Sequence, residues 1–263
     1  MSNTKIVTIK GGLGNQLFQY AYGLKASLID KKDVIFDTSF FTDNTKDINR
    51  PFLLNMFNIN PRAKFQKTQT SKSSKLIKKI ISKITGDYGY YQGEQYFIEA
   101  KDEVLKQFTL KYPLGKSAQD IANHMDKKTS VSVHIRRGDY VNNPHTNSVH
   151  GICNLEYYYR ALDHIKSKVK DPHFFIFSDD IEWAKNNLNI HNTIFVSNGD
   201  ISEVEEMILM SMCAHNIIAN STFSWWAAYL NKNNHKTVIA PKQWTRKSSS
   251  DKLNILPKSW IQL

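Results

Sequence analysis

Two adjacent arginines follow a strand-like run in the segment VSVHIRRGDY, residues 131–140. His134 ends the apolar run, and Arg136 and Arg137 come just after it. The planar guanidinium group suits phosphate, and open α/β sheets bind ligands where their strands end. Surface arginines that pair with carboxylates would give the same pattern. This segment alone therefore leaves a phosphate site and a structural role open.

A second strand-like run, FFIFSDD at residues 174–180, ends in Asp179 and Asp180. Neighbouring carboxylates could bind a metal ion, accept hydrogen bonds from a base such as guanine, or cap the following helix. Because the arginines already supply positive charge, this chemistry does not require a metal. The nine histidines are scattered, and we predict no metal site.

A third segment, NIIANSTFSWWAAYL at residues 216–230, places Asn220, Ser221 and Thr222 between a strand and a helix. Hydroxyl groups and backbone amides at a helix N-terminus make an anion site. An ordinary N-cap above two core tryptophans is the alternative. If parallel strands bring their ends to one edge, all three segments converge on one nucleoside diphosphate. The chain has no P-loop, H-E-x-x-H or G-x-S-x-G motif.

A glycine-rich segment near the N-terminus, KGGLGNQLFQYA at residues 10–21, follows a strand-like run. Gly12 and Gly14 fit the start of a dinucleotide-binding fingerprint, but Leu17 stands where that fingerprint has its third glycine. We interpret Leu17 as the start of the buried face of a helix. The glycines then make a tight turn that lets a substrate approach the backbone, with Asn15 and Gln16 facing the ligand.

Short, continuously apolar runs alternate with helix-like stretches, which predicts an α/β fold with parallel sheets. A break at MDKKTS indicates two domains, residues 1–128 and 129–263. The predicted strands are Lys5–Ile9, Val34–Asp37, Val131–His134, Phe174–Phe177, Thr193–Val196, Asn216–Ala219 and Thr237–Ala240. The predicted helices are Gln16–Ile29, Leu155–Val169, Ile181–Leu188, Glu203–Cys213 and Ser224–Asn231.

The 263-residue chain carries a net charge of +11, which suits an anionic partner. Its two cysteines lack a metal-ligand spacing, and we find no signal peptide or membrane-spanning run. We therefore expect a cytoplasmic protein. Residues 71–84 form a basic amphipathic pattern, which fits either a surface helix or peripheral contact with an anionic membrane.

The motifs GGLGNQLFQYA, HIRRGDY, FSDD and NSTFSWWAAYL occur in this order along the chain. With them, the sequence resembles the bacterial α-1,2-fucosyltransferases of glycosyltransferase family 11 over nearly its whole length. The resemblance implies a GT-B fold with two Rossmann-like domains facing a cleft. It also implies inverting transfer of L-fucose from GDP-β-L-fucose to O2 of a terminal β-galactosyl acceptor. No metal or cofactor is expected. The lysine-, asparagine- and isoleucine-rich composition further suggests an enzyme of bacterial surface-glycan synthesis, for O-antigen, lipooligosaccharide or capsule.

The resemblance also assigns roles to residues of the C-terminal, GDP-fucose-binding domain. Arg136 contacts the donor diphosphate and Arg137 supports it, while either Asp179 or Asp180 reads guanine. His134 lies near the nucleoside. Ser221 and Thr222 fall where the β-phosphate is held, and Asn220 is expected among the donor-binding residues.

The deprotonation of the acceptor is less well defined by the sequence. Asp139 is our first choice for the base because it lies beside the arginines, although it could instead only orient their loop. His150 and Glu94 are alternatives, and an oxocarbenium-like transition state would reduce the need for a base. From the N-terminal, acceptor-side domain, Gly12, Gly14 and Asn15 are expected near the transferred sugar or its leaving phosphate.

Two other classes of protein remain as alternatives. An NAD-type oxidoreductase would use Gly12, Gly14 and Asp37, which lies roughly 20 residues beyond the glycines. Leu17 and the motifs of the second half argue against it. A nucleic-acid-binding protein would need a basic surface lined with aromatic residues, whereas the lysines here cluster mainly in residues 71–84.

Overall fold

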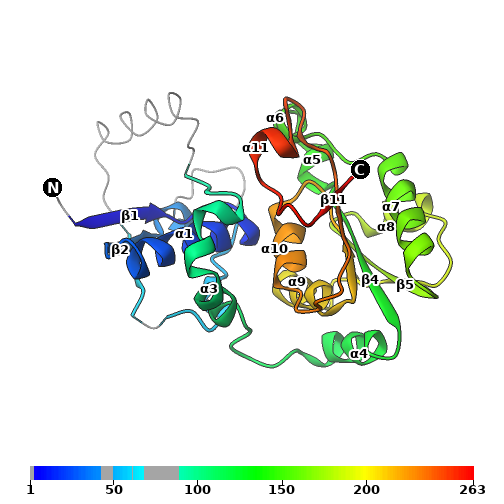
Figure 1. Cartoon of the computed structure of the whole chain (residues 1–263), viewed down its shortest axis with the longest axis horizontal. Helices are drawn as coiled ribbons and strands as arrows, with labels where there is room; N and C mark the ends of the chain where they lie inside the picture. The colour runs from blue at the N-terminus through cyan, green and yellow to red at the C-terminus, as the bar shows by residue number, and fades with distance from the viewer. Residues whose placement is uncertain (1–2, 43–49, 61, 68–88) are drawn as a thin grey trace. The chain divides into compact units, whose positions relative to one another are not determined.

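The computed structural model describes residues 3–42, 50–60, 62–67 and 89–263, and the chain divides into two units, Met1–Tyr112 and Pro113–Leu263 (Figure 1). The division falls earlier than the expected boundary after residue 128. Helix α4 (Lys116–Met125) belongs to the second unit because it packs against α9 (Glu203–Met212). The Gly115 N–H also donates a 2.7 Å hydrogen bond to Glu205 Oε1.

The first unit contains a parallel sheet in the order β1-β2-β3, formed by Thr4–Thr8, Asp33–Asp37 and Lys64–Gln66. Helix α1 (Leu13–Leu28) connects β1 to β2 and buries Leu17, as predicted. Gly23 of α1 meets the ring of Phe36 so closely that a Cβ there would lie 2.3 Å from a ring carbon. The remaining elements are η1 (Ser39–Thr42), η2 (Leu54–Met56), η3 (Glu94–Tyr96), η4 (Ile98–Ala100) and α3 (Lys101–Gln107).

The second unit contains a six-stranded parallel sheet in the order β11-β8-β7-β4-β5-β6. In chain order the strands are Thr129–Ile135 (β4), Pro172–Ser178 (β5), Thr193–Phe195 (β6), His215–Ile217 (β7), Val238–Ala240 (β8) and Ile261–Gln262 (β11). Along the chain, β5 and β6 therefore follow on one side of β4, and β7, β8 and β11 then follow on the other side. Ligands of such doubly wound sheets bind beyond the carboxyl ends of the two strands where the order reverses, which here are β4 and β7.

Helices cover both faces of this sheet (Figure 1). On one face, Val131, Val133 and Ile135 of β4 pack with α7 (Leu155–Lys168) and α8 (Ile181–Asn187). Alternate residues of β4 face the other side, where α9 and α10 (Thr222–Leu230) pack against each other. The remaining elements are α5 (Gly138–Asn142), α6 (Pro144–His150), α11 (Ser250–Leu253) and the antiparallel pair β9 (Gln243–Thr245) and β10 (Ser248–Ser249).

The predicted α/β class, with mainly parallel sheets in two units, is confirmed. All seven predicted strands and all five predicted helices correspond to observed elements, although several bounds shift. The cleft expected to lie between the domains stays a prediction. Residues 71–84, the amphipathic segment, lie outside the described residues. Within the described ranges, no helix combines the length and apolar character that crossing a membrane requires.

Candidate functional site

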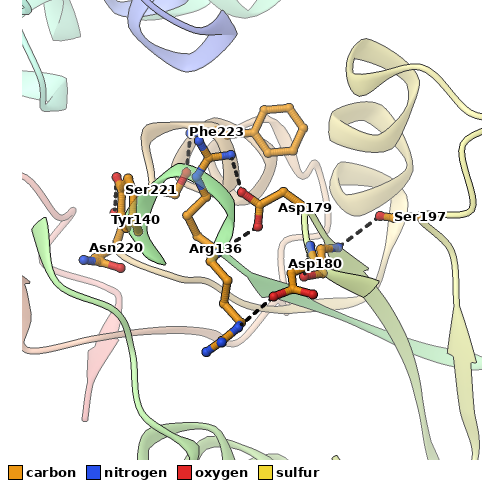
Figure 2. Close-up of polar contacts among 10 residues, drawn as sticks. Arg136, Tyr140, Asp179, Asp180, Ser197, Asn220, Ser221 and Phe223 are labelled. Carbon is orange, nitrogen blue, oxygen red and sulfur yellow. Dashed lines mark hydrogen bonds and ion pairs between the residues drawn. The ribbon is translucent and has the colours of Figure 1, made fainter. Parts of the chain in front are cut away.

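Arg136 lies directly beyond β4, at the point where the strand order reverses. Its Nη1 atom makes a 2.9 Å ion pair with Asp179 Oδ2, beyond the neighbouring strand β5 (Figure 2). The other carboxylate oxygen of Asp179 accepts a 2.8 Å hydrogen bond from the backbone N–H of Arg137. One carboxylate thus fixes both the side chain of the first arginine and the backbone of the second.

The close packing of this loop requires Gly138. A Cβ at this position would lie 2.4 Å from Asp179 Oδ2 and 2.9 Å from Asp179 Cγ. Only a residue without a side chain lets the carboxylate approach both arginines in this way. The aspartate that follows the next strand, β5, therefore explains why the R-R-G-D motif has a glycine at this position.

Arg137 contacts a second carboxylate and an aromatic ring. Its Nε atom donates to Asp180 Oδ2 at 3.1 Å, and its guanidinium carbon lies 3.8 Å from the ring centroid of Trp183. Asp180 Oδ1 also accepts from the Trp183 N–H at 3.3 Å and so caps α8, as one of the sequence alternatives proposed. These contacts give Arg137 the geometry of a supporting residue.

The N-terminus of α10 lies at the end of β7, on the other side of Arg136 from Asp179 (Figure 2). Ser221 is its N-cap, and the Ser221 hydroxyl accepts a 3.3 Å hydrogen bond from the Phe223 N–H. Thr222 is the first residue of the helix. The helix dipole adds partial positive charge at this end, next to the guanidinium group of Arg136. The arrangement can accept an anion with charge on several oxygens, such as a diphosphate.

Asn220 has a different role from the donor contact that we expected. Its buried Nδ2 atom donates to the carbonyl oxygens of His150 and Trp244, both at 3.1 Å, and of Gly151 at 3.4 Å. Its Oδ1 atom accepts a 3.5 Å hydrogen bond from the Cys153 thiol. The amide therefore joins the end of α6 to β9 and holds the loop that leads into Ser221.

His134 is only 4% exposed and lies on the face of β4 that α9 and α10 cover. Burial, assisted by the charge of Arg136, lowers its pKa to about 3, so the imidazole is neutral. Its ring centroid is 5.5 Å from that of Phe223. Its Nδ1 atom has no hydrogen-bond partner among the described residues. His134 therefore offers a ligand a neutral ring nitrogen rather than a positive charge.

The candidate bases differ in what the structure describes. Asp139 lies in α5, but its side chain is outside the described part of the structure. The ring of His150 stacks on Tyr140, with centroids 4.8 Å apart, and Tyr140 lies 5.3 Å from the guanidinium carbon of Arg136. Glu94 belongs to the first unit. The choice of Asp139 as the base stays a prediction.

The glycine-rich segment of the first unit forms the predicted tight turn. Gly11 has a φ of 78°, Gly12 is the N-cap of α1, and a Cβ on Gly12 would meet nothing within 4 Å. Gly14 is buried in the first turn of the helix. Asn15 is half-buried, and its Oδ1 atom accepts a 2.9 Å hydrogen bond from Gln92 Nε2. This turn presents open backbone at Gly12 beside the Asn15 amide.

The expectation that Gln16 faces a ligand is wrong. Its side chain is 0% exposed, and its Nε2 atom donates to the carbonyl oxygens of Gly11 at 3.0 Å and Pro51 at 2.8 Å. Its Oε1 atom accepts from the Leu53 N–H at 2.9 Å. Gln16 therefore fastens the glycine turn to the loop before η2.

Sequence reasoning missed Glu206, in the first turn of α9. The pKa of this half-buried carboxyl is raised to about 7, mainly by burial. A hydrogen bond with Ser197 lowers the pKa, whereas the negative charges of Glu203 and Asp179 raise it. The Ser197 hydroxyl also accepts a 3.0 Å hydrogen bond from the Ser178 N–H (Figure 2). In sequence, Glu206 cannot be told apart from the other acids that favour a helix N-terminus. Within the described ranges, no three His, Cys, Asp or Glu side chains form a metal-binding group.

The sequence pattern described as glycosyl transferase family 11 matches residues 8–263. The chain is 32% identical to an alpha-1,2-colitosyltransferase of Escherichia coli, over 98% of each chain. It is 33% identical to the O-antigen biosynthesis glycosyltransferase WbnK of the same species, over 97% of this chain and 99% of that one.

More distant similarity extends to animal enzymes and to a solved structure. Galactoside alpha-(1,2)-fucosyltransferase 2 of Sus scrofa is 30% identical, over 56% of this chain and 47% of its own length. The crystal structure of fucosyltransferase NodZ from Bradyrhizobium is 12% identical, with a TM-score of 0.47 over 88% of this chain and 93% of that one.

Proposed function

The chain belongs to glycosyl transferase family 11, and on this basis we propose that it is an inverting α-1,2-fucosyltransferase. It moves L-fucose from GDP-β-L-fucose to O2 of a terminal β-galactosyl group. The names of its relatives support the α-1,2 linkage, and the name of the Sus scrofa protein supports a galactoside acceptor. The observation that carries the proposal is the ion pair between Arg136 and Asp179 beside the N-terminus of α10, at the reversal of the strand order.

Arg136 and α10 act mainly on the leaving group. Cleavage of the bond between fucose and phosphate develops negative charge on GDP, and fixed positive groups stabilise this charge more in the transition state than before it. A guanidinium group has five N–H donors, more than the contact with Asp179 uses. Arg136 therefore keeps its position through Asp179 while it binds phosphate oxygens. Ser221 and Thr222 contribute from the start of α10.

The acceptor hydroxyl must also lose its proton during an inverting displacement. Asp139 is proposed as the base, and the oxocarbenium-like character of glycosyl transfer reduces how strong a base is needed. Gly12, Gly14 and Asn15 of the first unit act on the transferred sugar or its leaving phosphate. The reaction as proposed needs neither a metal ion nor a cofactor, because arginine and the helix dipole supply the positive charge.

We further propose that the acceptor is a galactose-terminated oligosaccharide or lipid-linked glycan of a bacterial surface polymer. Support comes from WbnK, which is named for O-antigen biosynthesis. Such an acceptor is consistent with a cytoplasmic enzyme that contacts the inner face of the membrane through residues 71–84. That segment lies outside the described residues, so the contact stays a proposal.

One relative favours a second donor. The Escherichia coli protein named alpha-1,2-colitosyltransferase is 32% identical over 98% of this chain, and colitose is the 3-deoxy form of L-fucose. The two donors are separated by incubating the enzyme with GDP-fucose or GDP-colitose and a panel of β-galactosides, followed by linkage analysis of the products. Fucosylation at O2 supports the proposal. Transfer of colitose alone, or transfer to another hydroxyl, would overturn the donor or the linkage.

A further inference from the structure

In the first unit, residues 90–92 contact helix α1 at two points. The ring of Tyr91 stacks on the ring of Tyr22, with centroids 3.7 Å apart. One residue further along, Gln92 Nε2 donates a 2.9 Å hydrogen bond to Asn15 Oδ1. Because Asn15 and Tyr22 are seven residues apart in α1, they lie on the same face of the helix. The segment is therefore fastened to the face of α1 that begins at the glycine turn.

The backbone on both sides of Gln92 has an unusual conformation. Tyr91 has a φ of 49°, in the left-handed region that residues with a side chain avoid, and Gly93 has a φ of 121°. Left-handed backbone at a residue other than glycine costs free energy, and it persists only where the surrounding structure enforces it. Such outliers cluster at functional sites. The strained segment holds Gln92 where its amide reaches Asn15.

The contact with Gln92 determines which atoms of Asn15 are left to bind a ligand. A side-chain amide has one acceptor oxygen and an NH₂ group with two donors. Gln92 uses the oxygen of Asn15, whereas the Nδ2 atom of Asn15 has no hydrogen-bond partner among the described residues. Gly11 leaves room for this NH₂ group, because a Cβ on Gly11 would lie only 3.0 Å from Nδ2. Asn15 therefore presents two N–H donors next to the open backbone of Gly12.

Resting on the proposed function, we propose that Gln92 is a positioning residue for sugar transfer, which holds the Asn15 amide with its N–H donors toward the reacting groups. These donors meet oxygen atoms of the transferred sugar or of its leaving phosphate. Gln92 acts only through Asn15. Without Gln92, the Asn15 amide would have two orientations of similar energy, because the last side-chain torsion of asparagine is broad and roughly two-fold.

The opposite orientation of Asn15 would oppose the reaction. Its Oδ1 atom would then face the substrate, and an amide oxygen cannot donate a hydrogen bond to a phosphate oxygen. Negative charge that develops on the leaving group would be repelled instead of stabilised. Because this charge grows toward the transition state, the contribution of Gln92 should be larger in kcat than in the affinity for GDP.

The substitution Gln92→Glu reverses the contact with almost no change of shape. A carboxylate only accepts hydrogen bonds, so it would hold Asn15 by Nδ2 and turn Oδ1 toward the substrate. Gln92→Met removes the contact without imposing either orientation. Gln95→Glu is the matched control, because it places the same charge three residues further along, on an exposed side chain.

Each variant is compared with the wild type in three measurements. These are kcat for transfer from GDP-fucose to a β-galactoside, affinity for GDP by titration calorimetry, and a thermal melt that checks folding. Both substitutions of Gln92 are repeated in an Asn15→Ala background, which gives two double-mutant cycles. A residue with a purely structural role would lower activity in both backgrounds, whereas a residue that acts through Asn15 would not.

The loss of a neutral hydrogen bond corresponds to roughly a 3- to 10-fold loss in kcat, which we expect for Gln92→Met. For Gln92→Glu we expect roughly a 10- to 100-fold loss, because the reversed amide also repels developing charge. Both variants should bind GDP almost as the wild type does, and Gln95→Glu should keep wild-type kcat. In the Asn15→Ala background, the substitutions of Gln92 should add little.

Wild-type kcat in Gln92→Glu would overturn the inference while the proposed function stands. An equal loss in Gln95→Glu would assign the effect to charge and overturn it too, as would losses at Gln92 that persist in full in the Asn15→Ala background. If Gln92→Glu does not fold, the cycle with Gln92→Met decides in the same way. If the wild type transfers fucose to no β-galactoside, the proposed function fails and the inference fails with it.

Discussion

The substitution Gly138→Ala tests whether Asp179 positions Arg136 for the reaction. The new methyl carbon would lie 2.4 Å from Asp179 Oδ2, the oxygen that accepts from Arg136 Nη1. The carboxylate must then move by about 1 Å to restore a normal van der Waals contact. Because Asp179 also accepts from the Arg137 N–H, this shift disturbs both arginines at once.

The size of the effect follows from these contacts. Weakening a charge-assisted hydrogen bond costs roughly 1.5–3 kcal/mol, whereas replacing glycine by alanine in a helix recovers at most about 1 kcal/mol. The free energy of unfolding should therefore fall by about 1–2 kcal/mol. A catalytic group displaced by about 1 Å can lose on the order of 10²-fold in rate, so kcat/KM for GDP-fucose should fall by about that factor.

The assay is a double-mutant cycle with Gly138→Ala, Asp179→Ala and the combined variant. Both kcat/KM and the free energy of unfolding by urea are measured for each protein. If the contact with Asp179 explains the effect, Gly138→Ala adds little damage once the carboxylate has been removed. Losses that simply add up, or a Gly138→Ala enzyme with wild-type kcat/KM, would refute the reasoning.

Four further results are expected. Arg136→Ala should fold, as judged by circular dichroism, but lose at least about 10²–10³ in kcat, and a folded variant with near wild-type turnover would exclude the role of this residue. Asn15→Ala should reduce transfer more than GDP binding, and equal losses of both would count against its placement near the transferred sugar. In the native protein Cys213, which is 1% exposed, should resist alkylation up to pH 9, because burial raises the pKa of its thiol to about 12, and rapid labelling would contradict that burial. The protonated form of Glu206 stabilises the fold, and this contribution is lost between pH 4.5 and about 7, so Glu206→Gln should raise Tm more at pH 8 than at pH 5.

Much of the site could be predicted because parallel strands bring their ends to one edge. His134, Arg136, Asp179 and Ser221 each follow an apolar run in the sequence, and the structure places them at the carboxyl edge of the sheet in the second unit. The runs themselves were recognisable because strands buried on both faces are continuously apolar. The position of the candidate site could therefore be predicted mainly from the apolar runs in the sequence, because these runs mark the buried strands.

The partners of these side chains could not be predicted in the same way. Arg137 and Asp180 are 43 residues apart in the sequence, and nothing local indicates that they pair. Gln16 has the polarity of a ligand-facing residue, yet distant backbone groups satisfy its amide in the interior. The boundary between the units was expected after residue 128, at a charged segment that follows α4. The second unit instead begins at Pro113, because α4 packs on α9. In each case long-range packing decided the outcome.

The order of the strands in the second unit also has a consequence for how the polypeptide is assembled. During synthesis β4, β5 and β6 emerge first, and one edge of β4 stays open until β7 arrives about 80 residues later. An open edge of this kind invites pairing with other chains. Arg136 belongs to the half of the sheet made early and α10 to the half made late. In the proposed function a donor diphosphate contacts both halves, so its binding should link them and stabilise the newly folded enzyme.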